Sequence, residues 1–491
     1  MKISTKIKPR YLILALCYLL PITFSINSII KGTVPFWHDP ARDLLQAWNN
    51  QTDPTLIGPP TGIEGIFYGP YWIWWLSFWQ LFSKSPRFVI LMSQAVPYFL
   101  GLPALLFLFR KSLKTSVLIS LCFLFLFAFV NYTNFLWNPH LSLLFLLALI
   151  WSATQTKLTP KHIFLSGLLV GFTGNFHMSI GLITAITTFI YYLVVSGKAL
   201  SCKAISLKQV GILLLTFVTG IALTILPFIV FELRHDFLQT QTFIENIQAE
   251  TNTLGGIKNS ELFQKFTGQA SRLLKTTYYQ TIAILFVASL VIFADLMQKQ
   301  LSLYNKQLLL FCTLFSLVLF GIYGSTSNPV WDYHFLGVEI IFVCWLALAA
   351  SLNRFFRWGL IVWSIFIFFQ ALWSLPLAFK QNALGIPSVG SKQHIVEQIL
   401  QDADRPFQWE AYSNDWRTTD FEYLFRWLAL NNSNYDNLRE KQVDLKYLII
   451  PVTSQDLRDD FINYKSSDDE FTTESVWKMQ DYTEVIKRVR K

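Results

Sequence analysis

Residues 67–83 read FYGPYWIWWLSFWQLFS, and the placement of this stretch decides the topology of the whole chain. The stretch is apolar enough to cross a membrane, yet it carries four tryptophans, Trp72, Trp74, Trp75 and Trp79. Trp prefers the headgroup level of a bilayer to its hydrocarbon centre. We therefore expect a helix that lies at the membrane surface, or dips into it, rather than a span.

Similar apolar runs dominate the rest of the chain. Of its 491 residues 53% are hydrophobic and only 14% are charged, whereas soluble domains are about 25% charged. A span needs about 20 apolar residues. Besides 67–83, the candidate spans are 11–31, 88–109, 115–133, 140–156, 163–176, 179–196, 209–230, 278–297, 307–323, 334–352 and 357–379. The five cysteines show no CxxC spacing, so neither a disulfide framework nor a cysteine metal site is expected.

The basic residues decide between eleven and twelve spans, because Lys and Arg concentrate in cytoplasmic loops. If 67–83 spans, the basic segments after 109 and after 156 fall outside. If it does not, all the basic loops share the N-terminal side, and the connections 134–140, 174–178 and 325–333 hold no Lys or Arg. The sequence thus predicts an all-α polytopic membrane protein with about eleven transmembrane helices and an interfacial Trp-rich helix. We expect its N-terminus to be cytoplasmic, its C-terminus extracytoplasmic and its membrane a bacterial plasma membrane. The alternative is a twelve-span protein with a cytoplasmic tail.

Three segments are expected to protrude on the outer side: 32–87, 231–276 and 380–491. Charge density rises in the last of these, so we divide the chain into a membrane domain, 1–379, and a small α/β domain, 380–491. Helices are predicted at 391–404 and 418–430, and strands at 406–413, 443–452 and 475–480. The small domain could recognise an acceptor, form a lid or only support the structure.

The stretch FWHDPARDLLQAWNN (36–50) follows the first span and places His38, Asp39, Arg42 and Asp43 close together. A carboxylate there can act as a general base. The sequence also allows two structural alternatives. Asp39 can be a helix N-cap before Pro40, and Arg42 can form a local ion pair with Asp43.

Other polar motifs map to the same predicted side. The Gly- and Pro-rich loop LIGPPTGIEGIFYGPYW (56–72) lacks the GK[ST] ending of a phosphate-binding P-loop. Each of the remaining motifs, taken singly, is more readily structural. They are FLWNPHLS (135–142) with Asn138 and His140, GNFHMS (174–179) with His177, ELRHDF (232–237) with Arg234, and NPVWDYHF (328–335) with Asp332 and His334. Together they place five of the seven histidines at outer ends of spans, a rim whose Arg and protonated His can bind a lipid phosphate.

As a set, HDPARD, LIGPPTGIEGIFYGP, WNPH, GNFHMS and LPFIVFELRHDF (226–237) resemble the GT-C membrane glycosyltransferases. The nearest branch is that of the protein O-mannosyltransferases and lipid A aminoarabinose transferases, and the resemblance covers about residues 10–380. It implies a polyprenyl-phosphate-linked sugar donor and transfer to an acceptor hydroxyl on the outer side. The family's catalytic aspartate falls on Asp39.

Only Asp39 is carried over by motif, and the remaining site residues are candidates for the chemistry that the resemblance implies. Arg42, Arg234, His177 and His334 are candidates to stabilise the leaving phosphate, because cations lower the barrier as its charge develops. Asp43, Asn138 and His140 are further substrate-binding candidates. The acceptor can be a lipid, a glycan or a protein, and no nucleic acid is expected as a partner.

The chain departs from the family where a metal would bind. The family often has a carboxylate before the interfacial helix and an Asp-Pro in the second outer loop, whereas this chain has the displaced Glu64 and Asn138-Pro139. Asn is a poorer ligand for a hard cation, so a divalent metal is in doubt and no cofactor is required by the sequence. The rival functions are a transporter of lipid-linked sugars and a non-catalytic scaffold. The absence of charges at span centres and of internal repeats speaks against transport.

Overall fold

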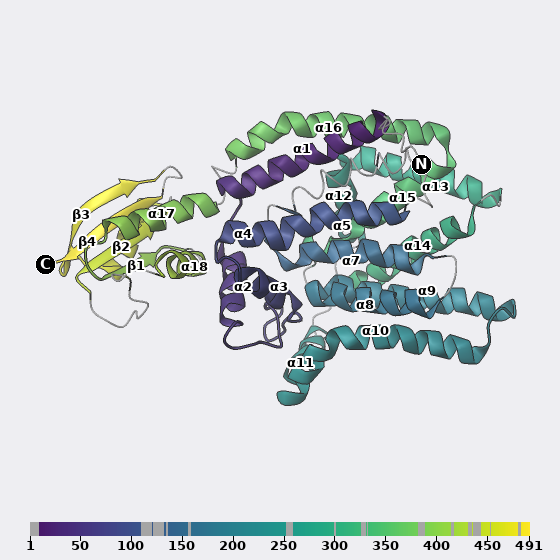
Figure 1. The fold of residues 1–491 in the computed structure, drawn as a ribbon, viewed down its shortest axis with the longest axis horizontal. Coiled ribbons are helices and arrows are strands. Elements are labelled where there is room, and N and C mark those ends of the chain that lie inside the picture. Colours follow the sequence, from purple (N-terminus) through teal and green to yellow (C-terminus); the bar gives the residue numbers. More distant parts are fainter. Residues whose placement is uncertain are drawn as a thin grey trace, which may run out of the picture.

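The structure, a computed structural model, describes most of the chain. The described residues are 9–109, 120, 132–133, 136–155, 159–251, 259–298, 301–325, 330, 332–381, 388–413, 417–430, 435, 443–451, 453–479 and 483–491. Long helices lie side by side, and a small domain with a β-sheet lies beyond one end of them (Figure 1). Most of the predicted run 115–133 lies outside the described residues.

The long helices coincide with the predicted apolar runs, because each span must satisfy its backbone hydrogen bonds internally. Among the described residues, six segments are long and apolar enough to cross a membrane. They are Pro86–Phe109 (α4, Pro86–Ile90; η1, Leu91–Ala95; α5, Val96–Phe109), α9 (Met178–Ser201), α10 (Leu207–Arg234), α13 (Tyr278–Met297), α14 (Leu303–Gly324) and Asp332–Leu352 (η2, Asp332–Phe335; α15, Val338–Leu352). Other predicted runs form α1 (Pro9–Lys31), α7 (Asn138–Ala153), α8 (Pro160–Phe176) and α16 (Arg354–Gln381). The helical membrane fold is confirmed, while the number of eleven spans stays a prediction.

The Trp-rich stretch forms α3 (Tyr71–Gln80), a helix of ten residues. Ten residues rise about 15 Å, half the roughly 30 Å of a hydrocarbon core. This helix lies beside α2 (His38–Asn49), at the end of the bundle that faces the small domain (Figure 1). It is not a simple surface helix, however, because Trp72 is fully buried and Trp75 donates its indole N–H to Ser93 O at 2.9 Å.

Helices α8 and α10 touch through their backbones. A Cβ added to Gly167 would lie 2.2 Å from Phe217 O, and one added to Gly220 would lie 2.5 Å from Phe164 O. Small residues permit such close approach between membrane helices, where packing rather than hydrophobic burial drives association.

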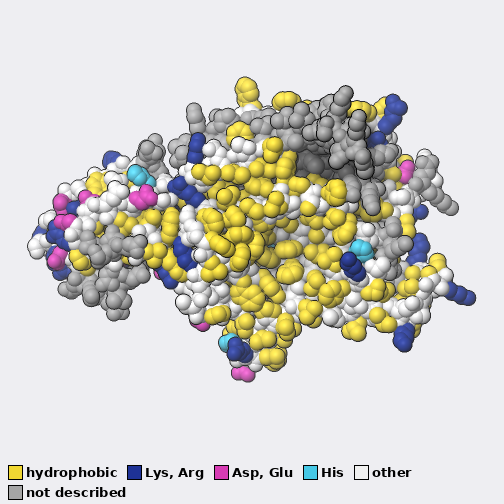
Figure 2. All heavy atoms as spheres, in the orientation of Figure 1, with side chains coloured by type: hydrophobic (Ala, Val, Ile, Leu, Met, Phe, Trp, Pro, Cys, Tyr) yellow, Lys and Arg dark blue, Asp and Glu magenta, His cyan; other side chains and the backbone are white. Residues whose placement is uncertain are grey.

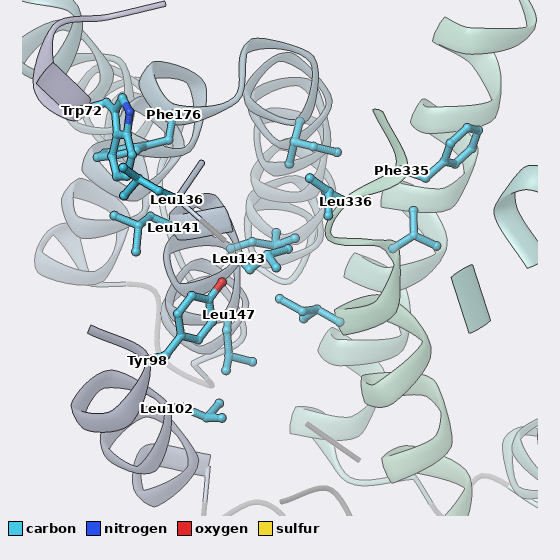
Figure 3. Packing of buried hydrophobic residues seen from close by; sticks show 14 of the residues in the cluster. Trp72, Tyr98, Leu102, Leu136, Leu141, Leu143, Leu147, Phe176, Phe335 and Leu336 are labelled. Carbon is cyan, nitrogen blue, oxygen red and sulfur yellow. The ribbon is translucent and has the colours of Figure 1, made fainter. Parts of the chain in front are cut away.

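The apolar core continues from the helix bundle to the end that carries α2 and α3. Figure 3 shows Trp72 of α3 beside Phe176 of α8, with ring centroids 6.2 Å apart, above Leu141 of α7 and Tyr98 of α5. The polar end of the molecule therefore rests on the same packed core as the membrane helices.

The segment predicted to protrude at 231–276 contains α11 (Leu238–Thr251) and α12 (Asn259–Leu274). Buried Glu232 caps α11, because its carboxylate accepts hydrogen bonds from Gln239 N at 3.2 Å and Thr240 N at 2.9 Å. A carboxylate at a helix N-terminus is favoured by the helix dipole.

The small domain has a four-stranded sheet of order β1-β2-β4-β3 in which β1 and β2 are parallel and the other pairs antiparallel. Its strands are β1 (Phe407–Ala411), β2 (Leu445–Ile450), β3 (Phe471–Lys478) and β4 (Glu484–Arg490), and its helices are α17 (Val389–Asp402), α18 (Thr419–Leu428) and α19 (Gln455–Lys465). Both predicted helices and the first two predicted strands are confirmed. The third strand begins earlier than predicted, and β4 and α19 are additional.

The start of the small domain is hydrogen-bonded to the chain that leaves the first span. Val389 N donates to Val34 O at 2.9 Å, and Gly390 N donates to Gly32 O at 2.8 Å. The connection between α1 and α2 is thus fixed by a segment more than three hundred residues away.

Candidate active site

Asp39, Arg42 and Asp43 form one ion-pair cluster on the first turns of α2. Arg42 Nη1 donates to Asp39 Oδ1 at 2.8 Å, and Arg42 Nη2 donates to Asp43 Oδ1 at 2.7 Å. Trp37 occupies the N-cap position, so Asp39 is not the cap. One guanidinium therefore bridges two carboxylates, and the trio keeps a net negative charge.

Asp43 anchors this cluster. It is 1% exposed, and Trp72 Nε1 donates to its Oδ2 at 2.8 Å. Burial raises the pKa of Asp43 from 3.8 to about 6, against the opposing effect of Arg42. Asp39, by contrast, has a side chain 40% exposed. Asp43 therefore holds Arg42, and Arg42 orients a carboxylate that solvent or a substrate can reach.

The small domain holds the beginning of α2. His38 Nδ1 lies 2.7 Å from Thr419 Oγ1 of α18. Lys392 of α17 donates to Phe36 O at 3.0 Å and forms a buried ion pair with Asp420. These contacts flank Asp39 in sequence, so the small domain contributes to the geometry of the cluster.

The Gly- and Pro-rich loop brings Tyr68 close to the cluster of Asp39, Arg42 and Asp43. Its two arms pair through Gly58 N and Tyr68 O at 2.7 Å, and Gly69 has no room for a side chain because its Cβ would lie 1.5 Å from Asn175 Oδ1. Tyr68 lies close enough to interact electrostatically with Asp43, Arg42 and Tyr333. Burial raises the pKa of Tyr68, so its phenol stays protonated and can donate a hydrogen bond.

A second cluster lies around the segment 330–335. His177, at the turn between α8 and α9, donates from Nε2 to Tyr333 O at 3.0 Å, and its ring centroid is 6.5 Å from that of His334. Lys265 of α12 lies within electrostatic range of His334 and donates to Val330 O at 2.6 Å. Gly62 lies close to Tyr333, because a Cβ added to Gly62 would be 3.3 Å from the Tyr333 hydroxyl oxygen. This contact links the second cluster to the loop that carries Tyr68.

The burial of His177 bears on the positive charge that we expected it to supply. The side chain is 1% exposed, and burial lowers the pKa of His177 to about 4. A group with this pKa is neutral at physiological pH. His177 can position the segment of Tyr333 through its hydrogen bond, and its role as a cation for phosphate stays a prediction.

Four other predicted residues lie apart from Asp39 or have structural contacts. Asn138 is buried and donates to Phe176 O at 2.9 Å, and His140 is buried with its Nδ1 3.1 Å from Tyr132 O. Arg234 is exposed at the end of α10, and Glu64 is exposed in the Gly- and Pro-rich loop. Neither is placed against the Asp39 cluster by a described contact.

Several site residues escaped the sequence reasoning. Tyr68 lies in a motif that we singled out, but nothing in the motif marked its phenol. Lys265 and Arg272 lie on amphipathic α12, and Arg272 pairs with Asp332 at 3.1 Å. No sequence signal connects α12 with 330–335, because the contact is long-range.

The described residues bring no set of metal ligands together around Asp39. Among the residues that the structure describes, no three His, Cys, Asp or Glu side chains form a group that could hold a metal ion. Asp39 and Asp43 already share Arg42.

Comparison with known proteins identifies the fold. No protein-family model and no curated protein sequence matches the chain. Among solved structures, ArnT from Cupriavidus metallidurans in the apo state matches with a TM-score of 0.60 at 10% identity, covering 98% of each chain. ArnT bound to undecaprenyl phosphate matches with a TM-score of 0.58 at 11% identity, covering 96% of this chain and 97% of ArnT.

A weaker likeness is to the arabinosyltransferase EmbB from Mycobacterium smegmatis, with a TM-score of 0.43 and 15% identity over 72% of this chain and 31% of EmbB. The likeness to ArnT extends over both the helix bundle and the small domain, since it covers nearly the whole of each chain. The protein therefore has the fold of the GT-C membrane glycosyltransferases.

Proposed function

We propose that the protein is an integral-membrane glycosyltransferase that moves a sugar from a polyprenyl-phosphate donor to an acceptor hydroxyl. The observation that carries this proposal is the Asp39–Arg42–Asp43 cluster, anchored by Trp72, at the end of a bundle with the ArnT fold. An exposed carboxylate oriented by a buried one is an arrangement suited to general-base catalysis.

In the proposed step Asp39 takes the proton of the acceptor hydroxyl as its oxygen attacks the anomeric carbon. The bond between that carbon and the phosphate oxygen breaks, and polyprenyl phosphate leaves with the bonding electron pair. Arg42 and Lys265 are the candidates to stabilise the negative charge that develops on the phosphate. Tyr68 can donate a hydrogen bond to the sugar or to the phosphate.

The donor class is supported by the undecaprenyl phosphate bound to ArnT, a protein of the same fold. We propose that the reaction takes place on the extracytoplasmic side. The basic loops that share the predicted cytoplasmic side support this orientation, and so does the position of α2, α3 and the small domain at the opposite end of the bundle from the start of α1 (Figure 1). The acceptor is a lipid, a cell-envelope glycan or a protein.

Release of polyprenyl phosphate tests the proposal. The full-length protein is reconstituted in lipid with a panel of polyprenyl-phosphate sugars and a crude envelope extract as acceptor. We expect release from one donor by the wild type and none by Asp39→Asn. The matched control is Asp459→Asn, which removes a half-exposed carboxylate of the small domain and should leave release unchanged.

Two results would count against the reaction. Normal release by Asp39→Asn would remove Asp39 from the mechanism. Transfer of intact donor across the bilayer, without release of polyprenyl phosphate, would favour the transporter instead.

A further inference from the structure

Two cations from different parts of the chain lie on one aromatic ring where the small domain meets α2. Lys84 Nζ is 4.8 Å from the ring centroid of Trp48, and the guanidinium carbon of Arg426 is 4.5 Å from it. Trp48 belongs to α2, Lys84 to the turn between α3 and α4, and Arg426 to α18. Cation–π attraction favours each contact, but the two like charges oppose each other.

The hydrogen-bond partners of these cations are neutral. Arg426 donates to Asn49 Oδ1 at 2.7 Å, and Lys84 donates to Gln51 Oε1. Within the described parts of the chain, no carboxylate forms an ion pair with either residue. Burial and the charge of Arg426 lower the pKa of Lys84 to about 8. The positive charges of Lys84 and Arg426 are therefore not balanced by a nearby carboxylate among the described residues.

The position of the pair is fixed from both domains. Tyr423 of α18 donates its hydroxyl to Lys84 O at 2.6 Å and accepts a hydrogen bond from Gln80 Nε2 at 3.1 Å. The Tyr423 ring also packs on Trp48, with centroids 5.9 Å apart. Arg426 lies one helical turn beyond Tyr423, so docking of α18 brings it beside Lys84.

Exposed apolar side chains lie directly before Lys84. Leu81 is 67% exposed and Phe82 is 65% exposed, and the apolar segment from Pro86 begins two residues after Lys84. Figure 2 shows Lys and Arg side chains gathered along the junction of the two domains, beside the broad hydrophobic face of the helix bundle. The cations thus lie next to exposed apolar side chains and to the start of a segment long and apolar enough to cross a membrane.

We propose that Lys84, Trp48 and Arg426 bind the phosphate group of an anionic membrane lipid whose acyl chains lie along Leu81 and Phe82. Guanidinium and ammonium groups make charge-assisted hydrogen bonds to phosphate oxygens, and basic pockets at membrane surfaces bind lipid headgroups. The bound lipid would join α2 to the small domain. This site is separate from Asp39 and does not depend on the transfer reaction.

Lipid titration of the full-length protein tests the proposal. The protein is delipidated in a non-ionic detergent, and binding of short-chain phosphatidylglycerol is followed by native mass spectrometry. Removing one cation should weaken binding roughly fivefold and removing both about 30-fold. The variants are Lys84→Gln, Arg426→Gln and the double substitution. The matched control removes two exposed cations elsewhere, Lys208→Gln with Arg405→Gln, and should bind as the wild type does.

Three further arms can overturn the assignment. Wild-type affinity in the double variant would show that these cations do not bind the lipid. Diacylglycerol binding as tightly as phosphatidylglycerol would show that the phosphate is not recognised. Inorganic phosphate displacing the lipid at equal concentration would assign the site to a free anion. The exchange Lys84→Arg with Arg426→Lys keeps both charges, and its retained binding would show that loss in the double variant is not a folding defect.

Discussion

Replacing Asp43 with Asn tests two effects of the buried carboxylate separately: its cost in protein stability and its role in holding Arg42. Burial raises the pKa of Asp43 from 3.8 to about 6. The ionisation constants of Asp43 in the unfolded and the folded state therefore differ by about 100-fold, which corresponds to a free-energy difference of roughly 3 kcal/mol. The folded-state pKa is higher than the unfolded-state pKa. The Asp43 carboxyl therefore contributes to the free energy of unfolding below about pH 4, where it is protonated, and this contribution is lost as the pH rises through about 6. Above pH 6 the wild type carries a buried charge that the Asn variant lacks.

We therefore expect Asp43→Asn to unfold at the same temperature as the wild type or higher at pH 7.5, and the difference to shrink toward pH 4. Transfer should fall about 100-fold at pH 7.5, because small displacements of catalytic groups have effects of this size. The amide must present its NH₂ group either to Arg42 or to the indole N–H of Trp72, so it cannot hold both donors.

Two measurements on one preparation decide the matter: thermal unfolding followed by intrinsic fluorescence between pH 4.5 and 8, and polyprenyl phosphate release. Asp459→Asn is the control for loss of a carboxylate outside the cluster. A variant several kcal/mol less stable than the wild type at pH 7.5 would refute the argument from burial. Full activity would refute the role of Asp43 as the anchor of Arg42.

Three other predictions follow from packing and orientation. Cys202, exposed between α9 and α10, should react with a membrane-impermeant maleimide only after permeabilisation, whereas a cysteine introduced at Ser467 should react at once; the reverse pattern would invert the proposed orientation. Lys392→Met should lower stability by about 3–5 kcal/mol, because it leaves Asp420 buried without its ion-pair partner, and an unchanged unfolding temperature would contradict this. Gly167→Val should prevent stable insertion, since even a Cβ there would lie 2.2 Å from a backbone oxygen of α10, and normal yield in membranes would show that the two helices are not in such close contact.

The helices of the membrane part could be predicted because hydropathy alone selects them. The ends of these helices could not be predicted in the same way. Helix α10, for example, continues to Arg234, whereas the predicted apolar run 209–230 ends four residues earlier. Strand β4 escaped prediction because Lys487 and Arg488 interrupt its apolar pattern. Both are nevertheless buried, and they pair with Asp402 at 3.0 Å and Asp468 at 2.6 Å. Only the tertiary structure supplies those partners.

The candidate site divides in the same way. The motif around Asp39 is local, so sequence reasoning could name Asp39, Arg42 and Asp43 together. It could not show that Asp43 is buried against Trp72, nor that His177 is almost fully buried. Burial depends on neighbours from other helices, and a single sequence carries no direct signal of it.

The contacts that fix the start of α2 have a consequence for biogenesis. Residues 32–38 leave the ribosome early, but their partners at Val389, Gly390, Lys392 and Thr419 are synthesised near the end of translation. We expect the helix of Asp39 to be loosely held until the last hundred residues have been synthesised and have folded. Nascent and truncated chains would then be inserted in the membrane but inactive. Co-expression of the missing C-terminal segment would be expected to restore activity.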